Sequence, residues 1–362
     1  MLIIEKNWKD KISTPALVLN YDIMEKNIEF MANFAKDNNI DLRPHVKTHK
    51  CPKIAQMQLK AGAIGICVAR IGEAEIFAQN GIDDILIANQ VVDLNQIKRL
   101  IDLNKKCLVR VCVDSEKNIL DLNRAATQNG IILEVLLEVD VGLGRNGVKP
   151  GEHALELANL IKKQKGLKLV GLQGYEGHLI SVKDSEMRKK LTESCMNLLI
   201  GTQDLLNNNG FDINYLTASN TGTYKFSVNC KGITEIQPGT YVFNDEHHYK
   251  IVDEFNIATT VLGTITNIPG KRFYTIDVGL KAITNDNGNP IFKNFPKSKI
   301  KIMSEEHSIF RSTPNTNFKI GQKIEINPTH ICTTVNLYDF FTVIKDGEII
   351  GRWDILARGK NY

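Results

Sequence analysis

Short apolar segments alternate with longer amphipathic ones along most of this chain, and this alternation limits the possible folds most strongly. Strands are predicted over 14–20, 40–44, 64–68, 84–88, 107–113, 131–139, 167–175 and 213–218. Helices are predicted between them over 22–34, 52–60, 72–79, 94–103, 115–128, 152–163 and 183–206. Strands connected through helices lie parallel, joined by right-handed crossovers. About eight such units in the first 240 residues predict an α/β fold with an N-terminal (β/α)8 TIM-like barrel.

The pattern changes near Pro238-Gly239. Beyond this point the helical periodicity disappears, and β-rich segments are separated by Asn-Gly, Pro-Gly and Asp-Gly turns. These segments are 251–262, 272–278, 300–303, 323–326, 340–344 and 349–356. We therefore expect a barrel domain over 14–240 and an all-β domain over 241–362, with residues 1–13 packed on the second.

Composition excludes several classes of protein. The net charge is only +4, from 45 Lys+Arg against 41 Asp+Glu, and no basic arm concentrates it, so we expect no nucleic-acid partner. The first ten residues lack the apolar core of a signal peptide, and no apolar run reaches membrane-spanning length. Seven scattered cysteines without a CxxC motif are typical of reduced thiols. We expect a cytoplasmic protein without a membrane partner.

The segment Pro44-His-Val-Lys-Thr-His-Lys50 follows a predicted strand, where barrels place their active sites. A lysine that points into such a site can hold a carbonyl cofactor as a Schiff base, which requires a neutral amine. The cations at His45, His49 and Lys50, together with partial burial, favour a neutral Lys47. The alternative is a solvated basic turn.

Further polar loops follow later strands. The loop Gly142-Leu-Gly-Arg145-Asn-Gly147 lacks the glycine spacing of a dinucleotide site and is either a binding loop or a flexible turn with a surface arginine. His178 also follows a strand and is a candidate acid or base. Small hydroxyl-rich loops after the last strands suit a phosphate, and their candidate residues are Thr217, Asn220, Thr221, Gly222, Thr223, Gly239, Thr240 and Tyr241.

His330 and Cys332 are candidate metal ligands in the β-rich part. If they lie in a strand, residues two apart face the same side and can bind one ion. Imidazole with thiolate favours Zn2+, and two ligands leave positions open for a Lewis acid. The alternative is a chance His-x-Cys pair.

Taken together, these motifs resemble the D-threonine aldolase and D-serine dehydratase family of pyridoxal-phosphate (PLP) enzymes, which have the alanine racemase fold. The resemblance extends over most of the chain and rests on Pro44–Lys50, Glu73, Gly144–Gly147, Gly171–Tyr175 and His330–Cys332. It implies a homodimer, a D-amino acid substrate, and a barrel followed by a β domain.

The resemblance also implies roles for individual residues. Lys47 would be the Schiff-base lysine with His45 beside the cofactor, and Arg145 would lie near the cofactor's phenolic oxygen. Gln173 and Tyr175 would line its ring, and the two hydroxyl-rich loops would hold its phosphate. His330 and Cys332 would bind the metal beside the substrate's β-hydroxyl.

The His-x-Cys pair resembles the zinc-dependent D-serine dehydratases, whereas the aldolases carry His-x-Asp and use Mn2+ or Mg2+. We therefore expect a D-serine dehydratase that forms pyruvate and ammonia, with Lys47 removing the α-proton and Zn2+ assisting departure of the hydroxyl. Because residues 333–339 resemble the aldolases, a D-threonine or 3-hydroxy-D-amino-acid aldolase with His178 as base is the alternative. A PLP-carrying protein without turnover is a third reading, disfavoured by the metal pair and the β domain.

Overall fold

The computed structural model describes residues 7–362, which form two compact units. The barrel unit comprises Glu29–Lys47, Pro52–Gly239 and Gly359–Tyr362. The β unit comprises the described residues up to Ile28 together with Thr48–Cys51 and Thr240–Arg358. Each unit thus takes segments from separate parts of the chain, whereas the sequence led us to expect one boundary near residue 240. Of the segment 1–13 that we expected on the β domain, residues 1–6 lie outside the described residues.

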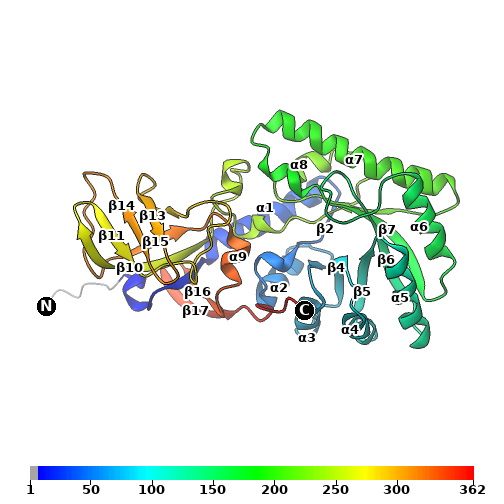
Figure 1. The fold of residues 1–362 in the computed structure, drawn as a ribbon, viewed down its shortest axis with the longest axis horizontal. Helices are drawn as coiled ribbons and strands as arrows, with labels where there is room; N and C mark the ends of the chain where they lie inside the picture. Colours follow the sequence, from blue (N-terminus) through cyan, green and yellow to red (C-terminus); the bar gives the residue numbers. More distant parts are fainter. Residues whose placement is uncertain (1–6) are drawn as a thin grey trace. The chain divides into compact units, whose positions relative to one another are not determined.

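Eight parallel strands form the barrel sheet, in the order β2-β9-β8-β7-β6-β5-β4-β3 (Figure 1). A parallel bridge between His45 and Cys67 joins the segment after β2 to β3 and closes the ring. The strands are β2 (Asp41–Leu42), β3 (Ile66–Val68), β4 (Asp84–Gln90), β5 (Leu108–Val113), β6 (Leu133–Val139), β7 (Leu167–Gly174), β8 (Tyr215–Ala218) and β9 (Glu235–Ile236). The predicted (β/α)8 barrel is confirmed.

Amphipathic helices follow the barrel strands. In α4, for example, Asp93 accepts hydrogen bonds from the amides of Asn95 and Gln96 at the helix start, and one face buries Ile97 and Leu100. The helices of the chain are α1 (Tyr21–Asp37), α2 (Pro52–Lys60), α3 (Ile71–Gln79), α4 (Leu94–Asn104), α5 (Glu116–Gln128), α6 (Glu152–Lys162), α7 (Ser185–Asn208), α8 (Tyr224–Ser227) and α9 (Ile331–Val335). Short 3-10 turns are η1 (Trp8–Lys11), η2 (Val46–Thr48), η3 (Gly177–Ser181), η4 (Thr240–Val242) and η5 (His248–Lys250).

The β unit is built on a mostly antiparallel sheet whose main path is β13-β14-β11-β10-β1-β16-β17, with β15 pairing with β10 and β12. Its strands are β1 (Ala16–Asn20), β10 (Thr259–Gly270), β11 (Phe273–Ile276), β12 (Ile291–Phe292), β13 (Lys299–Met303), β14 (Ser308–Arg311), β15 (Lys323–Asn327), β16 (Phe340–Lys345) and β17 (Glu348–Asp354). The predicted β-rich second domain is confirmed.

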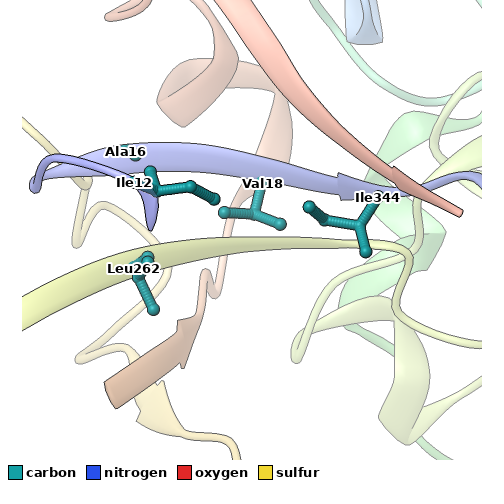
Figure 2. Packing of buried hydrophobic residues seen from close by; sticks show 5 residues of the cluster. All are labelled: Ile12, Ala16, Val18, Leu262 and Ile344. Carbon is teal, nitrogen blue, oxygen red and sulfur yellow. The ribbon is translucent and has the colours of Figure 1, made fainter. Parts of the chain in front are cut away.

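The first predicted strand needs a correction, because β1 belongs to this sheet and not to the barrel. It lies between β10, to which it is antiparallel, and β16, to which it is parallel. Figure 2 shows why the strand is stable there: Ala16 and Val18 pack with Ile12, Leu262 and Ile344 in one buried cluster. Burial of a valine or leucine side chain contributes roughly 1.5–3 kcal/mol, so this cluster fixes Ile12, Ala16 and Val18 in the β unit.

Among residues 7–362, the structure contains no helix with the length and apolar character needed to cross a lipid bilayer.

Candidate functional site

A cavity of about 340 Å3 opens at the C-terminal ends of the barrel strands. Residues that follow four different strands line it: Lys47 after β2, Arg70 after β3, Arg145 after β6, and Tyr175 after β7. His45, Gln173 and Gln237 also line it. Parallel strands end together at one rim of a barrel, and this brings the predicted residues His45, Lys47, Arg145, Gln173 and Tyr175 into one cavity. Arg70 was not among the predicted residues.

The cavity is strongly cationic. The Lys47 Nζ atom lies 5.6 Å from the centroid of the Tyr175 ring, and the Arg145 Cζ atom lies 5.4 Å from the same centroid. Arg70 adds a third positive charge, while no aspartate or glutamate occurs among the described residues that line the cavity. Such a lining favours an anionic, aromatic-stacking ligand.

A larger cavity, of about 700 Å3, lies at the other end of the barrel, beside the start of β2 at Asp41 and the residue before β9, Thr234. The side chains that line it include no histidine, cysteine or arginine. Volume alone therefore does not select the functional site, and the chemistry of the lining favours the Lys47 cavity.

Glu138, at the end of β6, holds the loop that carries Arg145. Its carboxylate accepts a 2.5 Å hydrogen bond from Gln90, whose side-chain oxygen accepts a 2.7 Å bond from Asn146. Burial raises the pKa of Glu138 to about 7, although the bond from Gln90 and the charge of Arg145 act in the opposite direction. Sequence reasoning missed this role of Glu138, and its position at a strand end was the available signal.

The predicted phosphate loop is organised by a second buried carboxylate, Glu176. This side chain accepts hydrogen bonds from the Thr223 hydroxyl and from the Ser219 amide, the latter at 3.3 Å. Asn220 closes the turn by accepting a 2.8 Å bond from the Gly222 amide, and burial raises the pKa of Glu176. The motif Gly-Tyr-Glu-Gly places this carboxylate directly after a cavity residue, a signal that we did not use.

Not all predicted phosphate residues share one place. Thr217 is buried and lies within the barrel interior, where its hydroxyl donates a 2.6 Å bond to Glu235. Gly239 belongs to the barrel unit, whereas Thr240 and Tyr241, in η4, belong to the β unit. None of the predicted phosphate residues, Asn220 to Thr223 included, lines the Lys47 cavity in the part of the chain that the structure describes.

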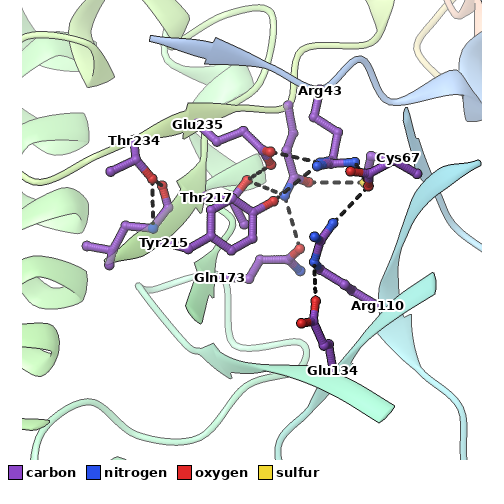
Figure 3. Close-up of polar contacts among 12 residues, drawn as sticks. Arg43, Cys67, Arg110, Glu134, Gln173, Tyr215, Thr217, Thr234 and Glu235 are labelled. Carbon is purple, nitrogen blue, oxygen red and sulfur yellow. Dashed lines mark hydrogen bonds and ion pairs between the residues drawn. The ribbon is translucent and has the colours of Figure 1, made fainter. Parts of the chain in front are cut away.

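Below the cavity, a polar network fills the barrel (Figure 3). Gln237 donates to Gln173 at 3.2 Å and to Thr217 at 2.6 Å, which fixes Gln173 at the cavity floor. The network continues through charged side chains with bonds of 2.6–3.0 Å: Glu235, Arg43, Asp84, Arg110 and Glu134. Complete pairing of these groups offsets much of the cost of burying their charges.

His178 lies in η3, after β7. It is not among the residues that line the Lys47 cavity, and a Cβ placed on Gly142 would stand 3.5 Å from its ring. Its Nδ1 atom is buried and has no hydrogen-bond partner among residues 7–362. The structure thus places His178 against the Gly142 loop.

The predicted metal pair does not lie in a strand, and this part of the prediction was wrong. His330 has extended backbone and is the N-cap of α9, so Cys332 lies in the first turn of that helix. The two side chains nevertheless meet in a hydrogen bond, and Asp286 bonds the Nδ1 atom of His330. Burial acts against protonation of His330, but the bonds to Cys332 and Asp286 outweigh it and raise its pKa to about 9.

Other contacts in the β unit fix this helix start. The Cys332 thiol donates to the Thr48 hydroxyl over 3.3 Å, and buried Asp245 accepts a 3.1 Å bond from the Ile331 amide. Within residues 7–362, no group of three or more His, Cys, Asp or Glu side chains forms a cluster able to hold a metal. A nitrogen and a sulfur donor that meet in this way fit a borderline-soft cation such as Zn2+, with Asp286 orienting the imidazole.

Comparisons with known proteins agree with this geometry. Residues 19–247, more than half of the chain, match the family described as alanine racemase, N-terminal domain. The chain belongs to this family. Residues 258–344 also match a serine dehydratase domain.

Individual relatives cover nearly the whole chain. D-threonine aldolase of Arthrobacter sp is 33% identical, with 96% of this chain and 93% of the relative aligned. 3-Hydroxy-D-aspartate aldolase of Paracoccus denitrificans (strain Pd 1222) is 31% identical, with coverages of 98% and 94%. The crystal structure of D-threonine aldolase from Filomicrobium marinum superposes with a TM-score of 0.94 at 32% identity, covering 97% and 96% of the two chains. The resemblance inferred from the motifs is confirmed, and the chain is a lyase of this family of PLP enzymes.

Proposed function

We propose that this chain cleaves the Cα–Cβ bond of 3-hydroxy-D-amino acids, such as D-threonine or 3-hydroxy-D-aspartate, to give glycine and an aldehyde. The observation that carries the proposal is the cationic Lys47 cavity at the mouth of a barrel that aligns over its whole length with two aldolases. A lysine, an arginine and an aromatic ring in one cavity are the groups that such a cleavage needs.

The residues of the cavity fit PLP. Its volume of about 340 Å3 is within the range of small-molecule sites. Lys47 would hold the aldehyde carbon of the cofactor, Tyr175 would lie against its ring, and Arg145 would meet a negative oxygen of the ring. When bound, PLP supplies an electron sink for the pair of electrons left on the α-carbon.

The chain's own side chains move the protons. In the cleavage, the Cα–Cβ bond breaks, the hydroxyl proton passes to a base, Cβ becomes the aldehyde carbon, and Cα takes up a proton to give glycine. Lys47 lines the cavity, and its amine is our candidate for delivering the proton to Cα. His178 is our candidate base for the hydroxyl proton, because its Nδ1 atom has no hydrogen-bond partner among residues 7–362.

His330 and Cys332 would hold the metal, and a metal held there would supply Lewis-acid stabilisation of negative charge on an oxygen. The thiolate donor favours Zn2+, and Mn2+ or Mg2+ are the harder alternatives. Asp286 would keep the imidazole of His330 oriented.

A second candidate is the D-serine dehydratase that we expected first from the sequence. The His330–Cys332 pair favours it, and D-serine dehydratase of Dictyostelium discoideum is 24% identical over 94% of this chain. We place it second because the aldolases align at 33% and 31% identity.

The product mixture separates the candidates. The chain is loaded with PLP and Zn2+, or Mn2+ in a parallel sample, and incubated with D-threonine, 3-hydroxy-D-aspartate and D-serine. Glycine and aldehyde in equal amounts support the aldolase, whereas pyruvate and ammonia from D-serine without glycine from the other substrates support the dehydratase. No product from any substrate contradicts both, and Lys47→Ala is the matched inactive control.

We also propose a homodimer in the cytoplasm, as the resemblance implies. Sedimentation equilibrium of the purified chain tests the oligomeric state, and a monomer would contradict it.

A further inference from the structure

Two arginines in the barrel unit differ from all the others. The unit has seven arginines, of which five are paired with carboxylates or backbone carbonyls: Arg43, Arg99, Arg110, Arg124 and Arg188. Arg70 and Arg145 form no ion pair with a carboxylate among residues 7–362, although the charge of Arg145 acts on Glu138, and both line the Lys47 cavity. Arg145 lies over the Tyr175 ring.

The backbone that carries Arg70 is held from two sides. The buried carboxylate of Glu73 accepts hydrogen bonds from the amides of Ala69, at 2.8 Å, and Arg70, at 3.1 Å. The Gly72 amide donates a 3.1 Å bond to the carbonyl of Tyr362. A Cβ on Gly72 would stand 2.6 Å from that oxygen, so only glycine allows the approach. The start of α3 thus presents Arg70 to the cavity from a fixed position.

The positive charges of the cavity can be allocated to ligands. If Lys47 and Arg145 face the cofactor, Arg70 is the one remaining lysine or arginine among the described residues that line the cavity. A phosphate is expected after the last barrel strands, β8 and β9, whereas Arg70 follows β3, on the far side of β2 from β9. Arg70 is exposed, and a neutral substrate side chain would leave its guanidinium without a counter-charge. A carboxylate would match its planar donors in a bidentate pair.

We propose that Arg70 binds the side-chain carboxylate of a dicarboxylic substrate, so that 3-hydroxy-D-aspartate is preferred over D-threonine. This rests on the proposed function, since it places the amino acid in the Lys47 cavity. Arg70 is then the residue that determines specificity between the two substrates.

The test uses the PLP-loaded chain and two ligands that lack a β-hydroxyl, so that binding is measured apart from cleavage. Isothermal titration calorimetry gives the affinities for D-aspartate and D-2-aminobutyrate in the parent, Arg70→Gln, Arg70→Lys and the control Arg124→Gln. We expect the parent to bind D-aspartate at least about 10-fold more tightly. Arg70→Gln should lower the affinity for D-aspartate roughly 10- to 100-fold and should change the affinity for D-2-aminobutyrate by less than about 2-fold. Arg70→Lys should recover part of the loss, and Arg124→Gln should match the parent.

Three results would overturn the role of Arg70. An equal loss of affinity for both ligands in Arg70→Gln would show that Arg70 binds the α-carboxylate. A loss of PLP absorbance would show that it binds the cofactor. Unchanged affinities would show that it binds neither ligand. A parent that binds D-aspartate selectively but cleaves no 3-hydroxy-D-amino acid contradicts the proposed function while supporting the role of Arg70.

Discussion

The sulfur of Cys332 lies 3.3 Å from the hydroxyl oxygen of Thr48, and the thiol donates a hydrogen bond to it. Both residues belong to the β unit, and Thr48 follows Lys47 directly in the sequence. One hydrogen bond therefore links a candidate metal ligand to the residue next to the candidate cofactor lysine.

Thr48→Val should weaken metal binding. If Cys332 bound a metal as a thiolate, it would accept a hydrogen bond from the Thr48 hydroxyl, and loss of such a neighbour typically lowers metal affinity about 10- to 100-fold. Chelator competition on the purified chain measures the affinity, with Thr266→Val, an exposed threonine of β10, as the control. An unchanged affinity in Thr48→Val, or an equal loss in the control, would contradict the link.

Asp286→Asn should lower the pKa of His330. The Asp286 carboxylate stabilises the charged imidazolium and helps to raise that pKa to about 9, and an amide lacks the negative charge. An NMR titration of the metal-free chain follows the imidazole, with the exposed Asp253→Asn as the control. If the two variants titrate His330 alike, Asp286 does not act on it.

Glu138 should make stability fall as the pH rises. Burial lifts its folded-state pKa from 4.5 to about 7, so the folded chain binds more protons than the unfolded chain between these values. This contribution to the free energy of unfolding is fully present below pH 4.5 and is lost as the pH rises through 7. The shift in pKa corresponds to about 3 kcal/mol. Urea unfolding of the cofactor-free chain at about pH 5 and pH 8 should show this loss in the parent and not in Glu138→Gln. A parallel pH dependence in the two proteins would refute the assignment.

Arg43→Met should destabilise the barrel by about 3–5 kcal/mol, because it leaves the buried carboxylate of Glu235 without its cation. Arg124→Met removes an ion pair of an exposed arginine and should cost less than about 1 kcal/mol. Urea unfolding compares the two variants. Similar losses in the free energy of unfolding of the two variants would show that the buried Arg43 network stabilises the barrel no more than an exposed ion pair does.

The sequence predicts the barrel well because its helices and strands are long and periodic, as in α4 and β6. It missed β9 and β12, which have two residues each and therefore no period to detect. It placed β1 in the wrong sheet, since an apolar run of five residues fits any buried strand and only tertiary pairing decides between sheets.

The candidate site divides in the same way. Residues at strand ends, such as Lys47 and Arg145, were predicted because barrel topology alone brings strand ends together. Arg70 was missed because only the folded barrel shows that the residue after β3 lines the same cavity as Lys47. Glu176 was missed because its role depends on burial and on its bond from Thr223, although its place directly after Tyr175 was an available signal. His330 and Cys332 were paired for the wrong reason, since a helix start and not a strand brings them together.

The central claim is that Lys47 holds the cofactor, and reductive trapping tests it most directly. The chain is loaded with PLP, reduced with borohydride and digested, and the modified peptide is sequenced by mass spectrometry. The account predicts one phosphopyridoxyl group, on Lys47. A group fixed to another lysine, or an unmodified Lys47 in chain that shows the cofactor's absorbance, would contradict it.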